Sequence, residues 1–107
     1  MVGVMVSFDY DGDFDRERVL GVAEKARSSF EGMPELRLKI FTIDEARQRA
    51  TNVYVWDSED AASRFFTDEL TERVTGLYGV RPRIEFVEIA ALVDNSGGTG
   101  RTAAGVS

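Results

Sequence analysis

The spacing of the apolar residues changes in a fixed order along the chain, and this order limits the folds available to it. Four segments show β-branched runs or strict alternation, which predicts strands; they cover residues 2–8, 35–43, 53–57 and 83–93. Two segments repeat apolar residues every three or four positions, as one face of a helix does; they cover residues 14–30 and the stretch that ends at Gly79. The order β-α-β-β-α-β predicts a ferredoxin-like α+β fold, with both helices on one face of an antiparallel four-stranded sheet.

Short signals support the ends of the first helix. Asp13 or Asp15 can cap its start, and Gly32 followed by Pro34 can end it, since glycine accepts the left-handed conformation and proline cannot continue a helix. Gly21 lies inside this helix, where glycine costs about 1 kcal/mol relative to alanine. A close approach to the sheet is one explanation for it.

The second half of the chain carries similar signals. Asp57 and Asp60 resemble a capping pair for the second helix. Pro82 directly precedes the last strand, and a proline there suits an edge position because it cannot donate a hydrogen bond to a neighbouring strand. We therefore expect the last strand at an edge of the sheet.

The length of 107 residues indicates a single domain. We place this domain at residues 1–93. The remaining residues, 94–107, show no periodicity and no bulky apolar run, which predicts a flexible tail.

The charge and the missing residue types exclude several functions. With 19 acidic and 13 basic residues the net charge is −6, which disfavours binding to nucleic acid or to an anionic membrane surface. The chain has no cysteine and no histidine, which excludes thiolate chemistry and removes the commonest zinc ligand and the usual haem ligand. No signal peptide or transmembrane run is visible, so we expect a cytoplasmic protein without a metal site.

The sheet has two faces, and the predicted helices cover one of them. We expect the helices to pack on the aliphatic alternation of the two middle strands, made of Leu36, Leu38, Ile40, Val53 and Val55. The uncovered face would then hold Met5, Ser7, Lys39, Phe41, Tyr54, Trp56 and one side of the last strand, either Ile84 and Phe86 or Val87 and Ile89. Such a patch exceeds what a soluble monomer usually exposes.

A second copy of the chain is the simplest cover for that face, with two sheets facing each other across a two-fold axis around a partly polar hollow. Two alternatives stay open. The face could bind a different protein, or its aromatic side chains could pair with each other on a half-exposed sheet.

The segments "MVSFDYDGDF", "LKIFT", "NVYVWDSEDAASRFF" and "FVEIAAL" resemble, over residues 2–93, the YdhR-type monooxygenases. That family is a branch of the dimeric α+β barrel superfamily, which includes the antibiotic biosynthesis monooxygenases. The resemblance implies a homodimer that oxygenates a small aromatic or polyketide-like substrate without flavin, haem or metal.

The resemblance also implies roles for individual residues. Lys39 and Tyr54 are the catalytic candidates, one as a cation and the other as a hydrogen-bond donor to a substrate or dioxygen oxygen. The candidate substrate-binding residues are Met5, Ser7, Phe41, Trp56 and Phe86.

Each of these roles has a structural alternative. Lys39 could be a surface lysine paired with Glu85 or Glu88, and Tyr54 and Trp56 could pack an interface. The function has an alternative as well, since the same fold could serve as a non-catalytic module that binds a small ligand or another protein.

Overall fold

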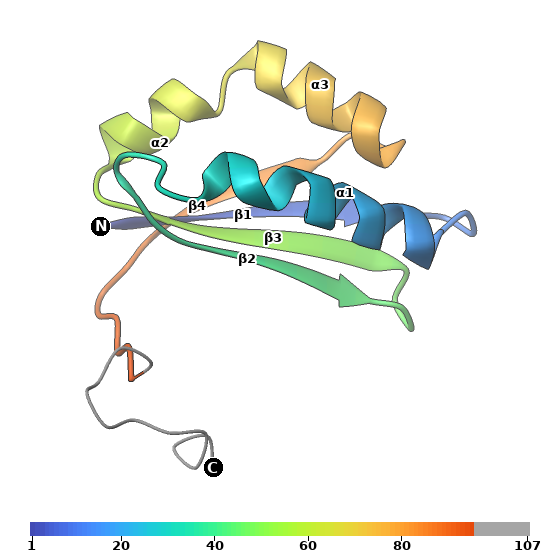
Figure 1. Cartoon of the computed structure of the whole chain (residues 1–107), viewed down its shortest axis with the longest axis horizontal. Coiled ribbons are helices and arrows are strands. Elements are labelled where there is room, and N and C mark those ends of the chain that lie inside the picture. The colour runs from blue at the N-terminus through green and yellow to red at the C-terminus, as the bar shows by residue number, and fades with distance from the viewer. Residues whose placement is uncertain (96–107) are drawn as a thin grey trace.

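A computed structural model describes residues 1–95 of the chain (Figure 1). Its elements follow one another as β1 (Val2–Asp9), α1 (Arg16–Phe30), β2 (Leu36–Asp44), β3 (Arg49–Trp56), α2 (Glu59–Phe65), α3 (Asp68–Tyr78) and β4 (Arg83–Glu88). The four strands form one antiparallel sheet in the order β2-β3-β1-β4. All three helices lie on the same side of this sheet (Figure 1). The predicted α+β fold is confirmed, and β4 occupies an edge as Pro82 indicated.

The second predicted helix is two helices in the structure. Ser58 caps α2 by accepting a hydrogen bond from the backbone N–H of Ala61, and Thr67 caps α3 in the same way through Leu70. The prediction that Asp57 and Asp60 form the capping pair was therefore wrong. Because two short helices replace one straight one, α3 can turn away from α2 and run beside α1 (Figure 1).

Several element ends also differ from the prediction. β3 begins at Arg49, four residues before the expected start, and β4 ends at Glu88. Asp15 caps α1 by accepting a hydrogen bond from the backbone N–H of Arg18, which confirms one of the two capping residues that the sequence suggested. The predicted flexible tail lies almost wholly at residues 96–107, outside the described part of the chain.

The core lies between the sheet and the helices, and it selects one side of each strand. On β1 this side is entirely apolar and buried: Val2, Val4, Val6 and Phe8. Cross-strand pairing joins Val4 to Tyr54 on β3, and Tyr54 to Lys39 on β2. The helices therefore cover the side of the sheet that carries Lys39 and Tyr54.

This arrangement corrects the prediction about the two faces. Lys39, Phe41, Tyr54 and Trp56 lie beneath the helices, and the aliphatic residues Leu38, Ile40, Val53 and Val55 lie on the other face, where Val55 is 6% exposed. Leu36, which precedes an irregularity in the strand pairing, packs against the core as expected. Aromatic rings bury more apolar area than aliphatic side chains do, so covering them stabilises the fold more. Met5 and Ser7 do lie on the uncovered face, as predicted, but the other candidate site residues do not share it.

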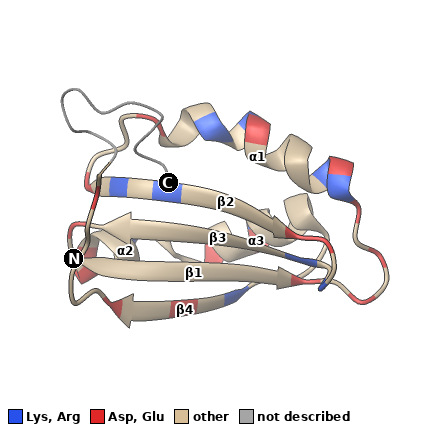
Figure 2. Cartoon of the chain, turned by 90° about the horizontal axis from the view of Figure 1, so that it is seen from below, with Lys and Arg blue, Asp and Glu red and all other residues tan. Residues whose placement is uncertain are grey.

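The uncovered face grades from apolar to charged along the strands. Leu38, Val55 and Val87 lie across one end of it. Ile40, Val53 and Met5 lie across its middle, where the row ends at the exposed Glu85 on β4. Charged residues gather at the opposite ends of the strands, and others lie near the start of β2 and along β4 (Figure 2).

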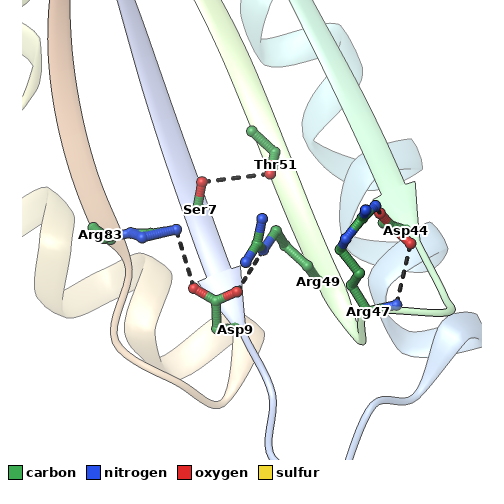
Figure 3. Close-up of polar contacts among 7 residues, drawn as sticks. All are labelled: Ser7, Asp9, Asp44, Arg47, Arg49, Thr51 and Arg83. Atoms are coloured by element: carbon green, nitrogen blue, oxygen red, sulfur yellow. Dashed lines mark hydrogen bonds and ion pairs between the residues drawn. The ribbon is translucent and has the colours of Figure 1, made fainter.

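The charged end of this face is held together by ion pairs (Figure 3). Arg49 donates to one oxygen of Asp9 at 2.5 Å, and Arg83 lies 3.2 Å from the other. Beside this pair, the Ser7 and Thr51 hydroxyl oxygens are 3.4 Å apart. Ser7 is thus engaged on the open face, away from the helices. Within residues 1–95, the helices fall short of the length and apolarity that crossing a membrane would need.

Candidate active site

A cavity of about 740 Å³ lies between the sheet, α1 and α3. One face of α1 and one face of α3 form its walls, with side chains spaced at three and four residues along each helix. Its floor comes from β2 and β3 and consists of Lys39, Phe41, Asn52 and Tyr54. The site is therefore built within one chain, between helices and sheet, and not on the uncovered face where the sequence placed it.

Gly21 explains part of the space in this cavity. A Cβ atom added at Gly21 would meet no other heavy atom within 4 Å, and the residue lines the cavity wall. The explanation that this glycine permits a close approach to the sheet was therefore wrong. Its effect is to leave the α1 wall open.

Lys39 is the central polar group of the floor. Its Nζ donates a hydrogen bond of 2.7 Å to the Tyr54 hydroxyl. The same Nζ lies 3.4 Å from the ring centroid of Phe30, 4.1 Å from that of Tyr54 and 4.3 Å from that of Phe41. Rings at these distances attract the ammonium form.

The electrostatics of this lysine follow from its burial. No carboxylate among the described residues lies within ion-pair distance of it, so the expected pairing with Glu85 or Glu88 is absent there. Desolvation lowers the pKa of the Lys39 ammonium to about 7. Burial also raises the pKa of the Tyr54 hydroxyl, which keeps it protonated at neutral pH. The floor thus presents an amine that can exchange a proton at neutral pH, next to a hydroxyl that can donate.

An aromatic cluster holds Tyr54 in place. Its ring contacts Phe66 edge-on at 4.8 Å between centroids and lies 5.8 Å from Phe65 and 5.9 Å from Phe30. Trp56 stacks parallel to Tyr54 at 6.1 Å, is 2% exposed, and does not line the cavity. Trp56 therefore supports the floor from behind and has no direct access to a ligand in the cavity.

Phe86 also lies outside the cavity, and it is 39% exposed. It lies on the helix side of β4 and contacts the ring of Phe66 at 6.0 Å, away from the cavity lining. Of the seven candidate residues, the structure brings Lys39, Tyr54 and Phe41 together in the cavity. Trp56 and Phe86 pack behind it, and Met5 and Ser7 lie on the opposite face of the sheet.

Sequence reasoning missed two polar residues of the site. Asn52 is 5% exposed and its amide nitrogen donates to the Tyr78 hydroxyl at 3.1 Å, with both residues lining the cavity. Tyr78 also stacks on the buried ring of Phe8, with centroids 3.7 Å apart. Asn52 lies two residues before Tyr54 on the same side of β3, so strand alternation could have found it.

The described residues hold no group of three or more histidine, cysteine, aspartate or glutamate side chains placed to bind a metal ion. The polar atoms available to a ligand in the cavity are those of the lysine, the two tyrosines and the asparagine amide on the floor side, together with Glu17, Ser29 and basic residues on the helices.

The sequence matches a known family over most of its length. The family bearing the description "Putative mono-oxygenase ydhR" matches residues 4–85. The chain belongs to the ydhR family. A comparison of this ydhR-family chain with curated proteins finds no match.

Solved structures agree with the family at the level of the fold. A monooxygenase from the gene ActVA-Orf6 of Streptomyces coelicolor, in complex with nanaomycin D, has a TM-score of 0.64 at 19% identity, over 88% of this chain and 92% of that one. SnoaB, a cofactor-independent oxygenase from Streptomyces nogalater, has a TM-score of 0.63 at 14% identity, over 86% of this chain and 95% of that one. The ydhR-family chain thus shares the fold of the antibiotic biosynthesis monooxygenases.

Proposed function

We propose that this chain is a cofactor-independent monooxygenase acting on a small aromatic or polyketide-like substrate in the cavity between its helices and its sheet. The observation that carries the proposal is the pairing of the Lys39 amine with the Tyr54 hydroxyl on the floor of an aromatic-lined cavity. Membership of the ydhR family supports the reaction class. The relation to SnoaB, whose own description is of a cofactor-independent oxygenase, supports the absence of a cofactor.

The residues of the floor match what such a reaction needs. A substrate with a CH₂ group between phenolic rings can lose a proton to the neutral Lys39 amine, and the resulting anion can pass one electron to dioxygen. Recombination of the two radicals forms the C–O bond of a peroxide anion, which takes back the proton held by Lys39 and becomes a hydroperoxide. Loss of water from the hydroperoxide then yields the ketone, so that CH₂ and O₂ become C=O and H₂O.

Each group in the floor has a part in this sequence. Lys39, once protonated, stays beside the anion and stabilises its charge. The Tyr54 hydroxyl can donate to the phenolate or superoxide oxygen, and the Asn52 amide can orient the substrate. The ring of Phe41 offers a surface for stacking.

Oxygen uptake and mass spectrometry on a panel of anthrones and quinols would test the function. We expect dioxygen consumption, and a product from anthrones that has gained one oxygen atom and lost two hydrogens. With ¹⁸O₂ the label should enter the product carbonyl. Saturable binding of the panel with no oxygen consumed would contradict the proposal and favour a non-catalytic ligand-binding module.

We further propose that a second copy of the chain covers the open face of the sheet. Ile40, Leu38, Met5 and Val87 are between 37% and 45% exposed there, and Val53 lies among them. A contiguous apolar patch on a sheet favours burial against a partner. A two-fold axis would pack this face against the same face of the second copy, while the proposed catalytic cavity lies on the other side of the sheet.

The variant Ile40→Asp should convert the dimer to a monomer, because it would place a carboxylate beside Val53 in the apolar part of the proposed interface. Leu20→Asp is the matched control, since Leu20 is exposed to a similar extent on α1 (43% against 45%) but far from the open face. Sedimentation velocity at micromolar concentration measures the outcome. A wild-type monomer, or a dimer that survives Ile40→Asp, would contradict the proposed interface.

A further inference from the structure

The basic side chains of this protein fall into two groups according to whether they have a carboxylate partner. Among residues 1–95, eight arginines lie within 4.0 Å of an aspartate or glutamate oxygen: Arg16, Arg27, Arg37, Arg47, Arg49, Arg64, Arg81 and Arg83. The four other lysines and arginines of that range have no such partner: Arg18, Lys25, Lys39 and Arg73. All four line the cavity, and none of the eight does.

The cavity is therefore basic in an acidic protein. The chain carries a net charge of −6, yet Glu17 is the one carboxylate among the described residues that line the cavity, against four cations. Elsewhere the excess of carboxylates neutralises the basic side chains. The net negative charge of the protein repels anions from most of its surface. An excess of positive side chains around one cavity therefore makes that cavity the favoured place for an anion to bind.

Two of the four cations already donate hydrogen bonds within the protein. Lys39 donates to Tyr54 on the floor. The Arg18 guanidinium donates to the backbone carbonyls of Leu77 and Gly76 at 3.2 and 3.3 Å, where it closes the C-terminal end of α3. Lys25 on α1 and Arg73 on α3 remain without any hydrogen-bond or ion-pair acceptor among residues 1–95, and both are exposed where they line the cavity.

We propose that the substrate is an aromatic acid, whose rings lie against the aromatic floor and whose carboxylate is bound by Arg73 and Lys25 at the mouth of the cavity. This inference rests on the proposed function for the identity of the cavity as the active site. A guanidinium binds a carboxylate through two parallel hydrogen bonds, and an ammonium adds a point charge. Anchoring one end of the substrate would leave its other end beside Lys39 and Tyr54.

A pair of probes that differ in charge alone tests the proposal. Isothermal titration calorimetry on the whole chain would compare naphthoate with naphthamide, its neutral isostere, at low ionic strength and pH 7 to 8. We expect naphthoate to bind roughly ten- to hundredfold more tightly, the range for hydrogen bonds to a charged group. Added salt should reduce this preference.

Arg73→Gln should abolish most of the preference for naphthoate without weakening the binding of naphthamide. Arg27→Gln is the matched control, because it removes the same charge from an exposed side chain on α1 that is outside the cavity and pairs with Glu31. Equal affinities for the two probes, tighter binding of the amide, binding of neither, or an equal loss in both variants would overturn the proposal.

These outcomes are separable from failure of the proposed function. A preference for naphthoate that depends on Arg73, found together with no oxygen uptake on any anthrone, would leave the acid-binding site standing and refute the oxygenase. Turnover of neutral anthrones with no preference for the acid would do the reverse.

Discussion

Replacing Lys39 with methionine is expected to lower kcat/KM for an oxidised anthrone by about 10²- to 10⁴-fold, the usual contribution of a positioned acid or base. Methionine keeps the length and the apolar stem of lysine but provides neither a base nor a cation. The ring cage formed by Phe30, Phe41 and Tyr54 would remain filled. Steady-state oxygen consumption by the two proteins gives the comparison.

The pH dependence of kcat/KM shows whether Lys39 acts as a base or only fills space in the cavity. Because burial lowers the pKa of Lys39 to about 7, wild-type kcat/KM should rise with pH, with a midpoint near 7, and level off above it. The residual activity of Lys39→Met should not show this rise around pH 7. A variant that keeps wild-type activity or the same pH limb would remove Lys39 from the mechanism.

Stability measurements provide the control for the fold. The unfolded chain keeps the Lys39 proton up to a pH near 10.5, while the folded chain releases it near 7, so the unfolded state binds more protons between these values. The free energy of unfolding contributed by this group therefore rises with pH from about 7 to about 10. Urea unfolding of Lys39→Met should lack that rise and should show no loss of stability at pH 6.

Introducing phenylalanine at Gly21 is expected to weaken naphthoate binding and anthrone turnover more than tenfold while leaving the protein at least as stable as the wild type. The new ring would enter the cavity from the α1 wall, where a Cβ meets nothing within 4 Å. Glycine inside a helix costs about 1 kcal/mol relative to alanine, and phenylalanine, which has an intermediate helix propensity, would recover part of that cost. Calorimetric titration and thermal unfolding measure the two effects.

Gly76 offers a matched control on the facing helix. It lies inside α3, an added Cβ there also meets nothing within 4 Å, and the residue does not line the cavity. Gly76→Phe should change stability by a similar amount and leave ligand binding unaltered. If both variants bind naphthoate like the wild type, ligands do not occupy the space between the two helices.

The fold could be predicted from the sequence because the apolar periods differ so clearly between segments. The break between α2 and α3 was not predicted because Phe66, Leu70 and Val74 continue one apolar helical stripe across it. Thr67 followed by two acidic residues is a typical helix start, and it could have revealed the second helix.

The assignment of the two faces failed for a physical reason. On β2 and β3 both sides carry large apolar residues, so alternation alone does not decide which side is covered. Lys39 looked like a solvent-facing residue, yet three rings and a hydroxyl enclose its amine. The sequence of β1 could have identified the covered face, since one side of this strand is wholly apolar. Antiparallel pairing joins Val4 on that side to Tyr54, so Tyr54 lies on the covered face as well.

The functional residues were predictable only where chemistry and strand position coincide. Lys39, Phe41 and Tyr54 were found because cations and rings alternate on neighbouring strands. The residues contributed by the helices, such as Arg73 and Lys25, were not found because a charged residue on a helix resembles any solvated surface residue. Recognising them required the structure, which shows that eight arginines among residues 1–95 have carboxylate partners.

The buried position of Trp56 makes the protein easy to follow by fluorescence. It is the single tryptophan of the chain, and its Nε1 has no hydrogen-bond partner among the described residues. Its indole is packed among Tyr54, Phe65 and Phe66 beneath α2, so its emission reports a buried, largely aromatic environment. Every experiment on folding therefore has an intrinsic optical reporter that needs no added label.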